Sequence, residues 1–419
     1  MRLAMAGAAG VRRSCAEALR FAALAVLALV LISLAPQSAD ARSKVREFAA
    51  TLSAAERQAF EKWYFAQLTH DASVDAYWRN VERKRSFRRR VRRKTWRFLA
   101  GDYVKTLPPT YEGPTLARGL LARWRKFRDA GRPPRSTREP LPGLPEYLAA
   151  AKHHYGFVPE RIPEAEFKRR YARAALSVGL TKEQVVRIYA LETGGRGTAD
   201  MQAGIHPISG KGRPISSALG YAQLLSANTI NVVSKHGQTF VARLQAMARR
   251  TPDAERRSIL LRKAAALKAM IRTARSVPYR WSRHIALSRT GRGMGLHPLN
   301  IDGDIGPWLQ IIKLAELKEL ASSRGRAKLS GAEIELMNLA GPATGLEMMM
   351  PVGRGMPTTN FFSRRAYNRN TIVRGKTAAG LLAALEERMK VSIRNEGAVE
   401  FARIFDSLLR VRRRAASND

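Results

Sequence analysis

A glutamate at the end of a predicted helix has the surroundings that best suit acid–base chemistry. Thr181 and Gln184 have capping-box spacing, which predicts a helix from Lys182 onward. Glu192 lies at the end of this helix, before two glycines that suit a helix C-terminus. The negative end of the helix dipole and the apolar neighbours disfavour a carboxylate, so we predict a raised pKa. A carboxyl group that is protonated near neutral pH can donate a proton to a leaving oxygen.

A second carboxylate facing Glu192 would change this chemistry. Asp302 and Asp304 lie in a polar, turn-rich stretch that ends at Trp308. Glycosidases with two catalytic carboxylates hold them about 5–9.5 Å apart, so either aspartate opposite Glu192 would indicate a hydrolase. The alternative is that these aspartates cap the helix that follows. The sequence leaves both interpretations open.

Motifs for cofactors and metals are incomplete in this chain. Residues 204–211 resemble a phosphate-binding loop, but five residues separate its glycines and Gly212 replaces the Ser or Thr. Residues 300–311 begin like a calcium loop, but isoleucines stand where a glycine and the final glutamate are needed. The histidines form no HExxH motif, and Cys15 is the only cysteine. We therefore expect no cofactor and no metal site.

Two short segments follow Glu192 in a suggestive order. Residues 220–223 read Gly-Tyr-Ala-Gln after a loop, and residues 338–342 read Asn-Leu-Ala-Gly-Pro at the end of a predicted helix. Together with Glu192 and Thr193, they resemble the lytic transglycosylases of the lysozyme-like superfamily. In that family Glu-Ser, Gly-Leu-Met-Gln and Ala-Tyr-Asn-Ala-Gly segments line one cleft. The resemblance covers roughly residues 180–373, with Tyr367 as a looser match to a tyrosine that follows in the family.

The resemblance implies cleavage of the β-1,4 bond between N-acetylmuramic acid and N-acetylglucosamine in peptidoglycan. Glu192 would protonate the leaving oxygen and then act as base on the muramyl 6-hydroxyl, which leaves 1,6-anhydro ends. Thr193 would replace the family's serine, and Tyr221 would offer an aromatic face to a sugar ring. The other expected substrate-binding residues are Gly220, Gln223, Asn338 and Tyr367. Tyr221-Ala222 in place of Leu-Met, and Met337 in place of a tyrosine, depart from the family pattern.

The elements that would position these residues are almost all helical, so we expect a mainly α fold. A charged start, the apolar run at 21–35 and small residues at 39–41 are typical of a signal peptide, which predicts export to the periplasm. Without cleavage, the same run would anchor the chain in the inner membrane. The expected divisions are a signal peptide at 1–41, a basic helical region at 42–130, a Pro/Gly-rich linker at 131–145, a lysozyme-like catalytic domain at 146–394 with a helical insertion at about 236–300, and a basic C-terminal helix and tail at 395–419.

The charge indicates a polyanionic partner. Lys and Arg total 74 against 34 Asp and Glu, a formal charge of +40. Ten of the fifteen residues from Arg83 to Arg97 are basic, with aromatic side chains between them. This stretch is either a solvated helix face or a contact surface for anionic cell wall or lipid. Since export is expected, we predict peptidoglycan rather than nucleic acid as the partner. The alternatives to a lyase are a muramidase that uses water and a non-enzymatic cationic wall-binding scaffold.

Overall fold

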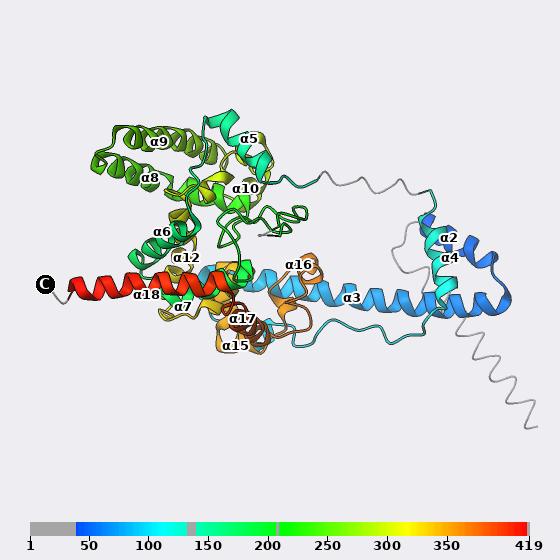
Figure 1. Cartoon of the computed structure of the whole chain (residues 1–419). Coiled ribbons are helices and arrows are strands. Elements are labelled where there is room, and N and C mark those ends of the chain that lie inside the picture. Colours follow the sequence, from blue (N-terminus) through cyan, green and yellow to red (C-terminus); the bar gives the residue numbers. More distant parts are fainter. Residues whose placement is uncertain (1–38, 132–139, 207–208, 417–419) are drawn as a thin grey trace, which may run out of the picture. The chain divides into compact units, whose positions relative to one another are not determined.

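The computed structural model describes residues 39–131, 140–206 and 209–416. These residues form helices joined by loops, with isolated β-bridges and no strand (Figure 1). This confirms the expectation of a mainly helical fold. The apolar run of the predicted signal peptide lies outside the described residues, and the expected cleavage site at Ala41 falls within the first described helix, α2 (Ala39–Ala50). No helix among the described residues is both long and apolar enough to cross a bilayer.

The chain divides into two compact units. Unit 1 holds the described residues of Met1–Arg83 and Leu107–Thr137, and unit 2 holds those of Lys84–Thr106 and Arg138–Asp419. Residues 132–139 of the linker expected at 131–145 lie outside the described residues. Lys84–Thr106, which the sequence placed in the N-terminal region, belongs instead to unit 2.

Unit 1 is a small helical unit with its own aromatic core. It contains α2, the first part of α3 (Ala54–Lys94) and α4 (Arg118–Asp129). The Glu56 backbone N–H donates to Ser53 Oγ at 3.3 Å, and the Ser53 N–H donates back to Glu56 Oε2 at 3.2 Å, so a capping box precedes α3. Phe48, Phe60 and Trp124 pack with ring centroids 5.0–5.2 Å apart.

Unit 2 holds the remaining helices. In chain order they are the last part of α3, η1 (Ala100–Asp102), α5 (Leu144–Tyr155), α6 (Glu164–Ser177), α7 (Lys182–Thr193), α8 (Ser226–Arg250), α9 (Ala254–Arg275), α10 (Trp281–Leu287), α11 (Gly291–Met294), η2 (His297–Ile301), α12 (Gly306–Ser322), α13 (Gly331–Ala340), α14 (Pro342–Met349), α15 (Pro351–Arg354), η3 (Thr358–Asn360), α16 (Arg364–Arg369), α17 (Ala378–Ser392) and α18 (Glu396–Ala416). Helices α8 and α9 form a hairpin (Figure 1). This hairpin, α10, α11 and η2 build most of the helical insertion expected at about 236–300.

The basic stretch from Arg83 to Arg97 is not a uniformly solvated surface. Arg88 is only 1% exposed, its Nε donates to Glu347 Oε1 of α14 at 2.8 Å, and its guanidinium lies 4.3 Å from the Tyr103 ring centroid. Arg92 pairs with Glu347 Oε2 at 3.0 Å. The middle of the stretch therefore fastens α3 to α14 within unit 2. Both interpretations of this stretch as a solvent-facing surface need correction at Arg88, whereas its neighbours Arg89 and Arg90 are exposed.

Candidate active site

Helix α7 places Glu192 in its last turn. The Gln184 backbone N–H donates to Thr181 Oγ1 at 3.2 Å, so the predicted capping box at the start of α7 is confirmed. The helix ends at Gly194, whose φ of 64° is the left-handed conformation that glycine adopts without a steric penalty. Helix α7 packs against α13, α17 and α18, so its far end is held from several sides.

Glu192 meets a second glutamate on the neighbouring helix. Glu335 of α13 is hydrogen-bonded to Glu192, and its side chain is only 3% exposed. Asn338 Nδ2, one helical turn further along α13, lies 3.4 Å from each carboxyl oxygen of Glu335. Because two carboxylates in contact repel each other, one member of the pair must carry a proton for this hydrogen bond to form.

Burial raises the pKa of both carboxyl groups. The pKa of Glu192 rises from 4.5 to about 7, and burial is the largest cause. Burial and then the charge of Glu192 raise the pKa of Glu335 well above its usual value. Since the two groups interact, their protons belong to the pair, and the pair retains a proton at neutral pH. The direction of the Glu192 shift is as the sequence predicted, and Glu192 keeps partial contact with solvent.

We expect Glu335→Gln to stabilise the protein at neutral pH. A carboxyl whose pKa is raised by folding binds more protons in the folded state, so its contribution to stability falls as pH rises above about 4.5. Glutamine needs no proton, and the gain at pH 7.5 should reach about 1–3 kcal/mol. Thermal unfolding of both proteins from pH 4 to 8 measures this difference.

The control for this prediction is Glu387→Gln. Glu387 lies on the exposed side of α17 and pairs with Lys390 at 3.5 Å in solvent. Its replacement should shift the melting temperature little, and equally at each pH. If Glu335→Gln raises the stability of the protein equally at pH 4 and at pH 8, the pKa of this pair of carboxyl groups is not raised.

Three other expected site residues have their polar groups committed to local structure. Thr193 is buried, and its hydroxyl donates to the Tyr189 carbonyl at 2.7 Å. Gln223 has a φ of 41°, and its Nε2 donates to the Gly220 carbonyl at 2.8 Å and to the Met201 carbonyl at 3.1 Å. Gly220 has a φ of 79°, and a Cβ there would lie 2.6 Å from Gln310 Nε2. Thr193 therefore belongs to the last turn of α7, and Gly220 and Gln223 shape the loop before α8.

Tyr221 does not fit the role of a sugar-stacking platform. Its side chain is fully buried, and its hydroxyl donates to Glu164. Its ring packs against those of Tyr189 at 4.8 Å, Tyr171 at 5.4 Å and Phe401 at 5.7 Å. Both ring faces are therefore inside the core of unit 2, and the expected aromatic face for a sugar is corrected to a packing role.

Tyr367 is also buried, and the described contacts give it a role in its own loop. Its hydroxyl accepts the Gly375 N–H at 2.9 Å, just after α16. Among the residues expected to bind substrate, Asn338 lies near Glu192. Its side chain contacts Glu335, and Glu335 contacts Glu192.

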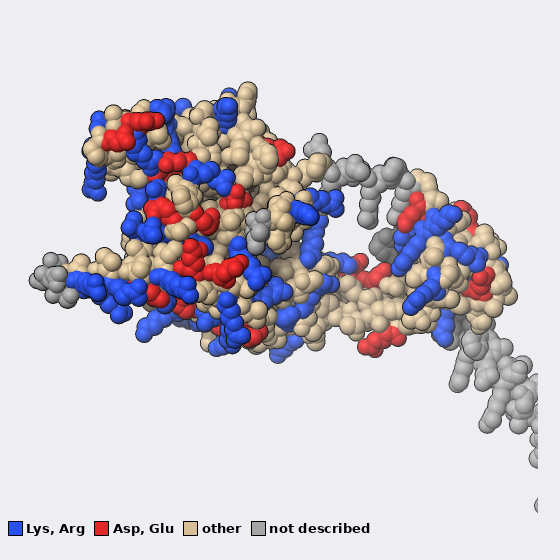
Figure 2. Space-filling view, in the orientation of Figure 1, with Lys and Arg blue, Asp and Glu red and all other residues tan. Residues whose placement is uncertain are grey.

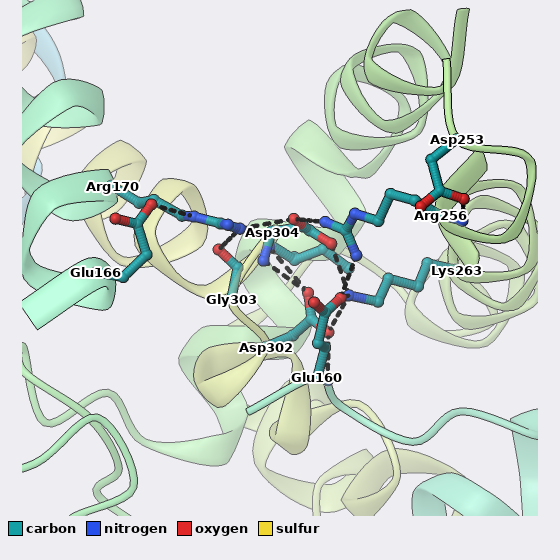
Figure 3. A network of polar contacts seen from close by, with 10 residues as sticks. Glu160, Glu166, Arg170, Asp253, Arg256, Lys263, Asp302, Gly303 and Asp304 are labelled. Carbon is teal, nitrogen blue, oxygen red and sulfur yellow. Dashed lines mark hydrogen bonds and ion pairs between the residues drawn. The ribbon is translucent and has the colours of Figure 1, made fainter. Parts of the chain in front are cut away.

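Asp302 and Asp304 form a separate ionic network (Figure 3). Lys263 of α9 lies 2.8 Å from Asp302 Oδ2 and 2.6 Å from Asp304 Oδ2. Asp304 also pairs with Arg170 and Arg256, and Lys263 with Glu160. Asp302 Oδ1 accepts the backbone N–H groups of Asp304 and Ile305, so it caps the turn before α12. The structure favours this capping and pairing role over that of a carboxylate opposite Glu192.

The sequence reasoning missed two residues near Glu192. One is Glu335, and its signal was a glutamate three positions before Asn338 within the apolar run of Ile334, Leu336 and Met337. A carboxyl on the buried face of a helix needs a partner, and residues three apart share a face. The second is Tyr171, a buried residue of α6 whose pKa is raised by burial and by the charge of Glu192.

Among the residues that the structure describes, no three His, Cys, Asp or Glu side chains gather in a way that could hold a metal ion. No protein-family model, curated protein or solved structure matches this sequence.

Proposed function

We propose that this chain is an exported, lysozyme-like lytic transglycosylase that cleaves peptidoglycan with Glu192 as its acid and base. The observation that carries the proposal is the Glu192–Glu335 pair. The raised pKa values of both carboxyl groups keep one proton on this pair at neutral pH. Glu192, at the end of α7, also keeps contact with solvent. Asn338, from the third family-like segment, lies beside the same pair. Two segments that resemble the family in sequence thus meet at one acidic site.

The reaction needs a single group that first gives and then takes a proton. Glu192 donates its proton to the glycosidic oxygen as the bond to C1 of the muramyl residue breaks. The substrate's acetamido group stabilises the positive charge at C1. The Glu192 carboxylate then removes the proton of the 6-hydroxyl, whose oxygen bonds to C1. The glutamate regains its proton, no water is consumed, and the product carries a 1,6-anhydro end.

Glu335 supports this chemistry as a positioning residue. Its buried carboxyl fixes the orientation of Glu192 through their hydrogen bond. It also limits the rise in the Glu192 pKa, because that hydrogen bond lowers it. A general acid is most effective when its pKa lies near the working pH, and a value of about 7 meets this requirement.

The pair argues against a hydrolase that uses both glutamates. Two-carboxylate glycosidases need about 5–9.5 Å between the groups to admit the sugar or a water molecule. Glu192 and Glu335 are in hydrogen-bond contact instead. Asp302 and Asp304 are engaged by Lys263, which favours the lyase over a muramidase that would use either aspartate.

Digestion of purified peptidoglycan sacculi by the purified protein tests this proposal. Mass spectrometry of the released fragments should find 1,6-anhydro-muramyl ends. Free reducing ends would identify a hydrolase, and binding without release of fragments would identify a wall-binding scaffold. Either of these two results would overturn the lyase.

A further inference from the structure

The C-terminal helix continues beyond the core that holds its first half. In α18, Ala398, Phe401 and Phe405 are fully buried, and Lys182 Nζ lies 2.7 Å from Asp406 Oδ1. After Phe405, no described side chain of α18 is buried. Figure 1 shows this end of the helix reaching past its neighbours toward the C-terminus. Two turns of helix are thus presented to solvent.

This projecting part of α18, residues 407–415, is amphipathic and strongly basic. At 100° per residue, Leu408, Val411 and Ala415 form one stripe that continues the side of Phe401. Arg410 and Arg413 fall on the opposite side, and Arg412 and Arg414 flank the stripe. Val411 is 66% exposed. The segment carries four arginines and no acidic residue. Figure 2 shows Lys and Arg side chains along this helix beside uncharged surface.

We infer that residues 407–415 dock on an anionic lipid surface. A helix with an apolar stripe flanked by arginines lies in the plane of a membrane, with the stripe in the acyl boundary and the cations at the headgroups. Each arginine near an anionic surface strengthens binding, and exposed apolar side chains add the burial that a purely ionic contact lacks. This inference does not depend on the proposed glycan cleavage.

The charge and the apolar side chains of residues 407–415 together favour an anionic lipid surface over other binding partners. A second copy of the same helix would bring two clusters of four arginines together, and like charges repel. A soluble polyanion would satisfy the arginines but would leave Leu408 and Val411 in water. An anionic bilayer satisfies both features at once.

A fluorescent reporter on the projecting helix tests the inference. Val411→Cys in a Cys15→Ser background is labelled with an environment-sensitive NBD dye. The labelled protein is then mixed with vesicles of phosphatidylglycerol and phosphatidylcholine in equal parts. We expect a several-fold rise in emission with a blue shift, and no change with pure phosphatidylcholine. A control label at Arg262→Cys, an exposed position on α9, should not respond.

Charge-matched variants test the same point by vesicle co-sedimentation. Glutamine at Arg410, Arg412, Arg413 and Arg414 should weaken binding to anionic vesicles by about tenfold or more. Glutamine at four exposed arginines of α8 and α9, namely Arg249, Arg250, Arg262 and Arg272, removes the same charge elsewhere and should weaken binding far less. Val411→Ser should also weaken binding.

Several results would overturn the inference. Equal loss in the two arginine variants would mean that overall charge alone drives binding. A silent label at position 411 in the presence of anionic vesicles would exclude insertion there. A wild-type dimer that the Val411→Ser change dissociates, measured by sedimentation velocity, would identify a second copy as the occupant instead.

Discussion

Glu192→Gln should reduce the rate of peptidoglycan cleavage by about 10²–10⁴-fold. Glutamine keeps the shape of the side chain and can still hydrogen-bond to Glu335, but it cannot protonate a leaving oxygen. The fold should survive, because the change removes a carboxyl whose ionised form is disfavoured by burial. Rates of muropeptide release, measured beside thermal unfolding at pH 7.5, should show lost activity with an unchanged or higher melting temperature.

Glu335→Gln is the matched control for this experiment. At neutral pH Glu335 is the member of the pair with the more strongly raised pKa. A glutamine amide imitates its protonated form and can donate the same hydrogen bond. The Glu335→Gln enzyme should therefore stay within about tenfold of the wild-type rate. If Glu335→Gln loses as much activity as Glu192→Gln, the proton donor has been assigned to the wrong glutamate.

Lys263→Met should destabilise the protein by about 3–5 kcal/mol. Lys263 is 5% exposed and is the cation that contacts Asp302, Asp304 and Glu160 together (Figure 3). Methionine fills a similar volume but leaves the buried Asp302 carboxylate without its ion pair. The melting temperature should fall by roughly 10 °C, which calorimetry measures.

Arg262→Met, one position earlier on α9, is the control for this loss. Arg262 is exposed, so its replacement should cost less than about 0.5 kcal/mol. Adding Asp302→Asn to Lys263→Met removes the orphaned carboxylate and should recover part of the stability. If Lys263→Met melts like the wild type, the network does not fasten α9 to the loop before α12.

Local patterns in the sequence predicted local structure well. The capping box at Thr181 was recognisable because Thr181 and Gln184 lie three residues apart. The sequence predicted helix over about 236–300, and most of α8 and all of α9 fall within that range. The direction of the Glu192 pKa shift was also predicted, although burial against other helices, and not the helix end, is its largest cause in the structure. The capping contacts, in contrast, are short in sequence.

Contacts between distant segments were beyond what residue patterns could predict. Arg88 is one of ten basic residues within a stretch of fifteen, and its sequence neighbours do not distinguish it from the others. Its burial and its ion pair with Glu347 depend on the packing of α14. The partner of Glu192 is 143 positions away, so Glu335 could be suspected of burial but not of this pairing. Tyr221 likewise has a residue type that suits sugar stacking, and its position in the core depends on α6, α7 and α18.

The pH dependence of cleavage by the wild-type protein tests the central claim most directly. The claim is that a carboxyl with a pKa of about 7, Glu192, must be protonated to start the reaction. The value of kcat/KM reports ionisations of the free enzyme, so it should fall about tenfold per pH unit above pH 7. Soluble muropeptide release, followed from pH 4 to 9, gives this profile. A rate that already falls above pH 5, as for an ordinary glutamate, or that stays constant to pH 9, would contradict the account.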